Sequence, residues 1–179
     1  MFRLEEKDKE FLFSDESQKI RIRPLAHDIF RITVTKKEQF SDTESRIVIC
    51  REEIQKIEKK ETDDCYKLIT KKYVLQLEKS TGRIVIRKGD RIVMAEAEQD
   101  GKLLSEFDSY KNIFSDESDI MTSGSVDGVR VNADNYKKVF YKKLYKCKLS
   151  FSFQDQEALY GFGSHEEGFG NLRGKYREL

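Results

Sequence analysis

A chain of 179 residues is long enough for one β-sandwich, and we expect a single domain over residues 1–179. The 34 Lys and Arg residues balance the 33 Asp and Glu residues, so a formal net charge of +1 gives no long-range field for a polyanion, and we expect no nucleic-acid partner. No stretch approaches the roughly 20 apolar residues that span a bilayer and the start has no apolar signal segment, so we expect a cytoplasmic protein without a membrane partner.

Strict alternation of apolar and polar residues predicts strands early in the chain. Residues 19–23 (KIRIR) and 30–35 (FRITVT) place their apolar side chains on one face only. The segment 24–28 between them has the length and turn chemistry of a hairpin connection, in which Pro24 cannot donate a backbone hydrogen bond. A short apolar run at 46–49 predicts a further strand.

A meander of short strands is predicted in the middle of the chain. The charged run 52–61 (EEIQKIEKKE) has too narrow an apolar stripe for a long helix, and a solvated strand or hairpin tip fits it equally well. Strands are predicted at 73–78, 83–87 and 91–95, and a Lys-Gly-Asp turn at 88–90 joins the last two.

The second half of the chain contains the clearest alternation. Residues 101–131 are rich in Ser, Asp, Gly and Asn, which predicts a long connection that holds a short helix or passes over the surface. Residues 145–153 (YKCKLSFSF) have an apolar residue at every odd position, which predicts a strand with Cys147 buried and a large loss of stability when Leu149 or Phe151 is truncated. Together these elements predict an all-β fold, an antiparallel β-sandwich with little helix.

A short motif, FSDES, occurs at residues 13–17 and again at 114–118, with a near copy at 40–45. The irregular spacing does not fit a solenoid repeat. Ser, Asp and Glu directly after an apolar residue are typical of a turn at the end of a strand, and we interpret the motif in this way.

Enzyme motifs are nearly absent from the sequence. It contains no nucleophile elbow, phosphate-binding loop, HExxH pair or dinucleotide fingerprint, and His27 and His165 lie far apart. The three cysteines, Cys50, Cys65 and Cys147, are widely spaced and predict neither a disulfide framework nor a zinc site. We therefore expect no catalytic residues, no cofactor and no metal.

The most informative stretch is 157–176, where five glycines fall within fourteen residues and alternate with aromatic residues. Residues 160–163 (YGFG), a short polar loop and residues 171–174 (NLRG) resemble the signature Y-G-[LF]-G…N-x-R-G in the amino-terminal domain of glycoside hydrolase family 31, the α-glucosidase and α-xylosidase family. The early hairpin and the middle meander also resemble that domain. The signature residues that we expect to be structural are Tyr160, Gly161, Gly163, Arg173 and Gly174.

The resemblance implies a β-sandwich of the galactose-mutarotase-like type, packed against a catalytic (β/α)₈ barrel that carries the nucleophile and the acid/base. Such a barrel takes about 250 residues, which is more than this chain has, so the resemblance implies a fragment of a larger enzyme. The partners that it implies are the enzyme's own barrel and the oligosaccharide substrate of the parent enzyme. The loop beside the signature is expected to contribute to the rim of the sugar pocket. The rim candidates are His165, Glu166, Glu167 and Asn171.

Two other functions stay open. A free-standing carbohydrate-binding or interaction module would need an aromatic platform, and with no Trp and scattered Tyr and Phe residues the sequence shows no obvious one. A sugar mutarotase would need acid and base side chains converging in its own groove, which two lone histidines do not predict. Residues 175–179 end in what the resemblance makes a strand, so self-association through an unpaired edge or a barrel-facing surface is also expected.

Overall fold

A computed structural model describes residues 1–7, 10–25, 28–41, 57–114, 120–125, 128–133, 136–160 and 171–174. Its contacts divide the chain into two units, Met1–Gly101 with Ser150–Leu179, and Lys102–Leu149. All regular elements of the described residues are strands, and these strands pair antiparallel, which confirms the predicted all-β class. In these residues no helix is present that could cross a membrane. The expected single domain stays a prediction.

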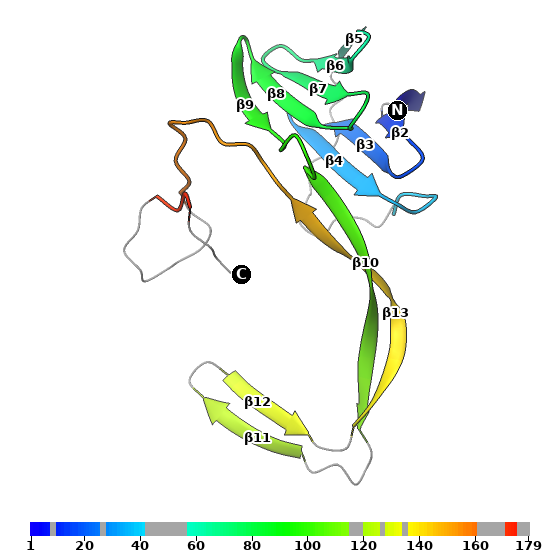
Figure 1. Ribbon diagram of the computed structural model, residues 1–179, viewed down its shortest axis with the longest axis vertical. Helices are drawn as coiled ribbons and strands as arrows, with labels where there is room; N and C mark the ends of the chain where they lie inside the picture. Colours follow the sequence, from blue (N-terminus) through cyan, green and yellow to red (C-terminus); the bar gives the residue numbers. More distant parts are fainter. Residues whose placement is uncertain are drawn as a thin grey trace. The chain divides into compact units, whose positions relative to one another are not determined.

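The first sheet contains four strands in the order β1-β2-β3-β4 (Figure 1). Their bounds are Arg3–Lys7, Glu10–Ser14, Lys19–Pro24 and Phe30–Thr35. The two predicted strands of the early hairpin are confirmed as β3 and β4. Pro24 was expected in the connection but is the last residue of β3, opposite Phe30.

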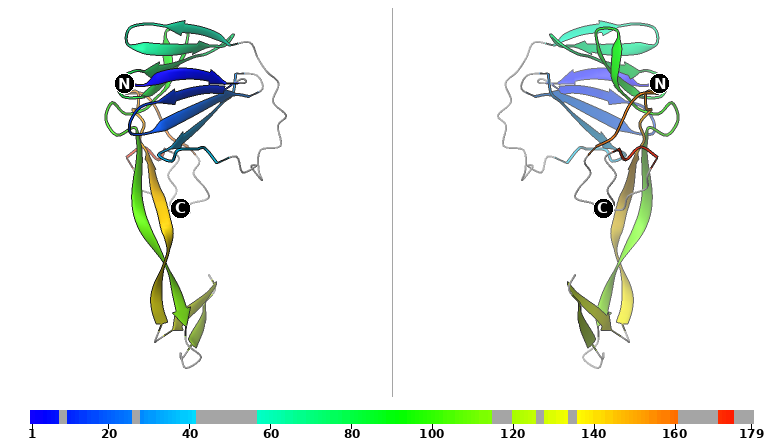
Figure 2. Two further views of the ribbon diagram at one scale, coloured as in Figure 1. Left: turned by 90° about the vertical axis from the view of Figure 1, so that its right-hand side faces the viewer. Right: turned by 90° about the vertical axis from the view of Figure 1, so that its left-hand side faces the viewer.

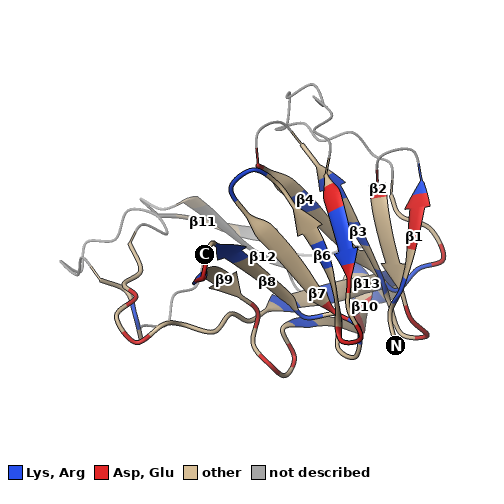
Figure 3. Ribbon diagram, turned by 90° about the horizontal axis from the view of Figure 1, so that it is seen from above, with Lys and Arg blue, Asp and Glu red and all other residues tan. Residues whose placement is uncertain are grey.

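The second sheet contains five strands in the order β5-β6-β7-β8-β9, and it confirms the predicted meander. Their bounds are Glu58–Glu61, Cys65–Ile69, Val74–Glu78, Ile84–Lys88 and Arg91–Ala95. The charged run ends as the exposed strand β5, so the strand alternative holds for its last four residues. The strand predicted at 46–49 lies outside the described residues. In Figure 3, charged residues of both signs lie along the strands, as expected of sheets with one face in solvent.

The core lies between these two sheets, and the two layers are visible in Figure 2. Because alternate residues point to opposite faces, β2 and β3 bury Phe13, Ile20 and Ile22 against residues of β6, β7 and β8. The ring centroids of Phe13 and Tyr66 lie 5.4 Å apart across the two layers. Buried Phe2 adds a link, since its backbone nitrogen donates to the carbonyl of Lys79 at 2.7 Å. This packing is the predicted sandwich.

The first FSDES copy forms a turn after β2, as predicted. Asp15 Oδ1 accepts hydrogen bonds from the backbone nitrogens of Ser17 and Gln18, each at 2.9 Å, and from Ser17 Oγ. Partial burial raises the pKa of Asp15, but these hydrogen bonds lower it, and the net pKa lies below its ordinary value. Residues 115–118 of the second copy and 42–45 of the near copy lie outside the described residues.

The second unit corrects the prediction for residues 101–131. Instead of a long connection, β10 (Lys102–Phe114) pairs along its length with β13 (Tyr136–Leu149), with an irregularity between Ser109 and Tyr110. A second pair is formed by β11 (Ile120–Ser125) and β12 (Gly128–Ala133). A strand without a core-facing side needs no apolar alternation, which explains why the sequence pattern did not reveal β10.

The predicted burial of residues 145–153 is wrong. Strand β13 ends at Leu149, which is 57% exposed, and Cys147 is exposed as well. Phe151 lies beyond the strand in an isolated bridge to Glu96 and is 43% exposed. The alternation does put Cys147 and Leu149 on one face, but in a two-stranded ribbon a shared face is not a core.

Candidate functional site

The segment that follows β13 returns to the end of β9. The backbone nitrogen of Ser152 donates to the carbonyl of Ala95 at 2.8 Å, and that of Ala97 donates to the carbonyl of Ser150 at 2.9 Å. These bonds extend the edge of the second sheet by one short bridge. They fix where the next residues, 154–157, leave the sheet.

Buried Glu96 reinforces this junction. Its Oε2 accepts a hydrogen bond from the backbone nitrogen of Ile84 at 2.8 Å, and its carbonyl accepts one from Arg83 Nε at 2.8 Å. Arg83 also pairs with Glu78 at 2.9 Å. A buried carboxylate is tolerated when hydrogen bonds replace its water, so Glu96 joins the end of β9 to β8 without an orphaned charge.

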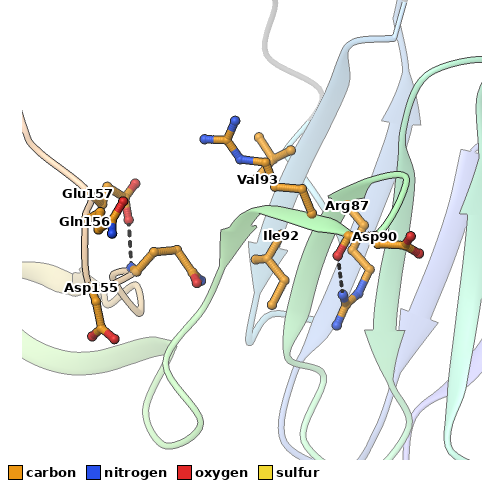
Figure 4. A pocket seen from close by; sticks show the side chains of 9 residues that line it. Arg87, Asp90, Ile92, Val93, Asp155, Gln156 and Glu157 are labelled. Atoms are coloured by element: carbon orange, nitrogen blue, oxygen red, sulfur yellow. Dashed lines mark hydrogen bonds between the residues drawn. The ribbon is translucent and has the colours of Figure 1, made fainter.

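A cleft of about 750 Å³ lies between the β8–β9 hairpin and residues 154–157 (Figure 4). This volume is in the range of about 300–1,000 Å³ typical of small-molecule sites. Both walls belong to the first unit. The lining residues are Arg87, Asp90, Arg91, Ile92, Val93, Gln154, Asp155, Gln156 and Glu157.

The lining is mostly polar and carries both signs of charge. On the hairpin wall, Arg87 donates to Gln76 Oε1 at 3.1 Å and to the carbonyl of Asp90 at 3.4 Å. On the other wall, the backbone nitrogen of Gln154 donates to Glu157 Oε2 at 3.1 Å. Guanidinium, amide and carboxylate groups together suit the hydroxyls of a neutral ligand. Within the described ranges, no three His, Cys, Asp or Glu side chains are grouped to hold a metal.

Arg173 holds the 154–157 wall in place. One guanidinium nitrogen donates to the carbonyls of Gln154, Asp155 and Glu157 at 3.1, 2.7 and 3.1 Å. Asn171 lies beside it, and its Oδ1 accepts from the backbone nitrogens of Leu159 and Arg173, both at 3.1 Å. Two residues of the family signature therefore fasten the loop that lines the cleft.

The remaining predicted site residues are only partly described. Tyr160 is 70% exposed, and Gly174 has a φ of +75°, which favours glycine. Gly161, Gly163, His165, Glu166 and Glu167 lie outside the described residues, so the rim assignment stays a prediction. Sequence reasoning missed Arg87 and residues 154–157, because polar residues near turns resemble ordinary surface in the sequence.

Replacing Arg173 with lysine is expected to loosen the 154–157 wall. A lysine ammonium has three donors but lies one bond closer to the backbone than the guanidinium nitrogen that makes these bonds, so it cannot reach all three carbonyls. Losing one charged hydrogen bond should speed amide exchange of residues 154–160 by about tenfold. Hydrogen–deuterium exchange followed by mass spectrometry measures this rate. Arg91→Lys is the matched control, because Arg91 lines the same cleft from the hairpin wall. Unchanged exchange in the Arg173 variant would contradict the fastening role.

Comparison with known proteins agrees with the signature. Residues 19–178 match the family described as the glycosyl hydrolase 31 N-terminal galactose mutarotase-like domain. A similar solved structure is a GH31 alpha-xylosidase from a soil metagenome complexed with xylose, at 10% identity and a TM-score of 0.47. The match covers 67% of this chain and 22% of that one, and no curated protein matches the sequence. Because the family match spans most of the chain and the fold is the expected sandwich, the chain belongs to the glycosyl hydrolase 31 N-terminal galactose mutarotase-like domain family.

Proposed function

We propose that this chain is the non-catalytic amino-terminal sandwich of a retaining α-glycosidase of the α-glucosidase or α-xylosidase type. In this role it packs against a catalytic barrel, supports it and shapes the rim of the sugar pocket. The family match over residues 19–178 supports the place of the domain in such an enzyme. The parent's substrate would be an oligosaccharide with an α-linked terminal sugar.

The observation that carries the proposal is the fastening of the 154–157 wall by Arg173. A signature residue whose guanidinium donates to three backbone carbonyls has a structural role: it fixes the shape of the surface and does not transfer protons. Retaining hydrolysis needs two carboxyl groups about 5 Å apart, one as nucleophile and one as acid/base. A domain that shapes the site while a barrel supplies both carboxylates fits this arrangement.

The chain alone is expected to hydrolyse no aryl α-glucoside or α-xyloside, because the proposal places both catalytic carboxylates on a barrel. Release of nitrophenol at high protein concentration measures this activity. Turnover that disappears on Asp155→Asn or Glu157→Gln would contradict the proposal, since these carboxylates line the cleft of this chain.

The supporting role has its own test. A family 31 barrel that lacks its amino-terminal sandwich should unfold at a higher temperature when this chain is added, because a partner that binds only the folded state stabilises it. A thermal midpoint that does not change with the concentration of the chain would contradict a supporting role.

A further inference from the structure

The β10–β13 ribbon concentrates the exposed apolar surface of the described residues. Ten of the sixteen large hydrophobic side chains that are strongly exposed lie on these two strands. A two-stranded sheet is marginally stable alone, and apolar surface gathered in one place marks a site of interaction. Figure 1 shows β10 and β13 twisting around each other along their length.

Four of these side chains form two aromatic rows on one face of the ribbon. Tyr110 lies opposite Phe140, with ring centroids 6.2 Å apart, and Phe114 lies opposite Tyr136, at 5.9 Å. Each of the four side chains is between 43% and 54% exposed. The rings within a pair are inclined at 83° and 59°, so the two rings of a row do not form one flat surface.

A polar row separates the two aromatic rows. Asn112 lies opposite Lys138, and both are exposed. Because residues two apart on a strand share a face, these side chains lie on the same face as the rings. With a rise of about 3.4 Å per residue and four residues from one aromatic row to the next, the rows are roughly 14 Å apart along the ribbon. We call this set of six residues the aromatic face.

The alternation of rings and polar groups identifies the class of ligand. A pyranose has an apolar C–H side that packs on an aromatic ring and hydroxyls that need donors and acceptors. A purely apolar protein surface would leave the amide of Asn112 and the ammonium of Lys138 without partners when it covered them. Lys138 is the one charged member of this set, and the neighbouring Lys111 and Lys137 lie on the opposite face of the ribbon, so a polyanion would meet no cluster of positive charge here.

We infer that the aromatic face binds a neutral polysaccharide chain, with one sugar over each aromatic row and intervening hydroxyls on the Asn112–Lys138 row. The structure brings together rings that are scattered in the sequence, which is why the sequence alone showed no platform. The inference rests on the proposed function, because an α-glycosidase is the setting in which such a domain meets glycans. Binding would hold the parent enzyme near a polymeric substrate.

Affinity electrophoresis of the full chain in native gels with xyloglucan or amylopectin tests the inference. At least one of these glycans should retard the unaltered chain. Tyr110→Ser and Phe140→Ser should each weaken the apparent affinity about tenfold, whereas Tyr110→Phe keeps the ring and should keep the retardation. Ile113→Ser is the matched control, because Ile113 is 55% exposed on the opposite face. None of these substitutions changes the net charge.

Three outcomes would overturn the inference. The first is that neither glycan retards the unaltered chain. The second is that Ile113→Ser weakens retardation as much as Tyr110→Ser. The third is that light scattering shows Tyr110→Ser dissociating an oligomer while glycans have no effect, which would make the aromatic face a protein interface. Circular dichroism of each variant checks the fold. Glycan binding is measured without a barrel, so failure here is distinguishable from failure of the supporting role.

Discussion

Replacing Leu75 with alanine is expected to lower the free energy of unfolding by about 2–5 kcal/mol. Leu75 is fully buried in β7, where it lies opposite Leu68 of β6 and Ile86 of β8. Its side chain therefore sits in the middle of the second sheet, facing the first. Truncation removes apolar contacts and leaves a cavity that the surrounding sheets can close only in part.

Leu149→Ala is the matched control for this experiment. The same side chain is removed, but at a position that is 57% exposed at the end of β13, so the expected change is within about 0.5 kcal/mol. This reverses the expectation from sequence, in which Leu149 was a core residue. Urea denaturation followed by far-ultraviolet circular dichroism gives both midpoints. Equal losses in the free energy of unfolding at Leu75 and Leu149 would show that Leu149 is buried and that another part of the protein covers the ribbon.

One-sided alternation was sufficient to predict most of the sandwich. In β3, Ile20 and Ile22 alternate with arginines and face the core, as the pattern predicts, although Arg21 between them is also buried and pairs with Glu10 at 3.8 Å. In β7, Leu75 and Leu77 alternate with polar residues and are buried likewise. The pattern succeeds there because a sheet with one wet face and one dry face imposes a period of two.

The same reasoning failed where that physical condition was absent. Strand β10 has exposed side chains on both faces, so its sequence carries no dry-face signal and was interpreted as a connection. Residues 145–149 do alternate, yet alternation shows only that side chains share a face and not that another layer covers it. The cleft was missed because one of its walls, residues 154–157, is held by hydrogen bonds from Arg173 to backbone carbonyls. Such bonds depend on the path of the backbone and leave no pattern in the sequence.

Replacing Gly82 with alanine is expected to destabilise the sandwich by about 2–4 kcal/mol, the sum of two separate penalties. Gly82 lies in the turn between β7 and β8 with a φ of +70°, and its nitrogen donates to the carbonyl of Glu78 at 2.9 Å. An L-residue in this left-handed conformation costs about 1 kcal/mol. In addition, a Cβ here would lie 2.5 Å from Cε2 of buried Phe2, which forces the ring to move in a packed core.

Gly89→Ala separates the two penalties. Gly89 has a similar φ of +57°, but a Cβ there meets no atom within 4 Å, so only the backbone cost of about 1 kcal/mol is expected. Urea midpoints of the two variants should therefore differ by the cost of the steric clash. Adding Phe2→Leu to Gly82→Ala shortens the opposing side chain, and the double variant should lose less stability than the two single changes added together. Equal effects of Gly82→Ala and Gly89→Ala, or strict additivity in the double variant, would show that Phe2 does not pack against this turn.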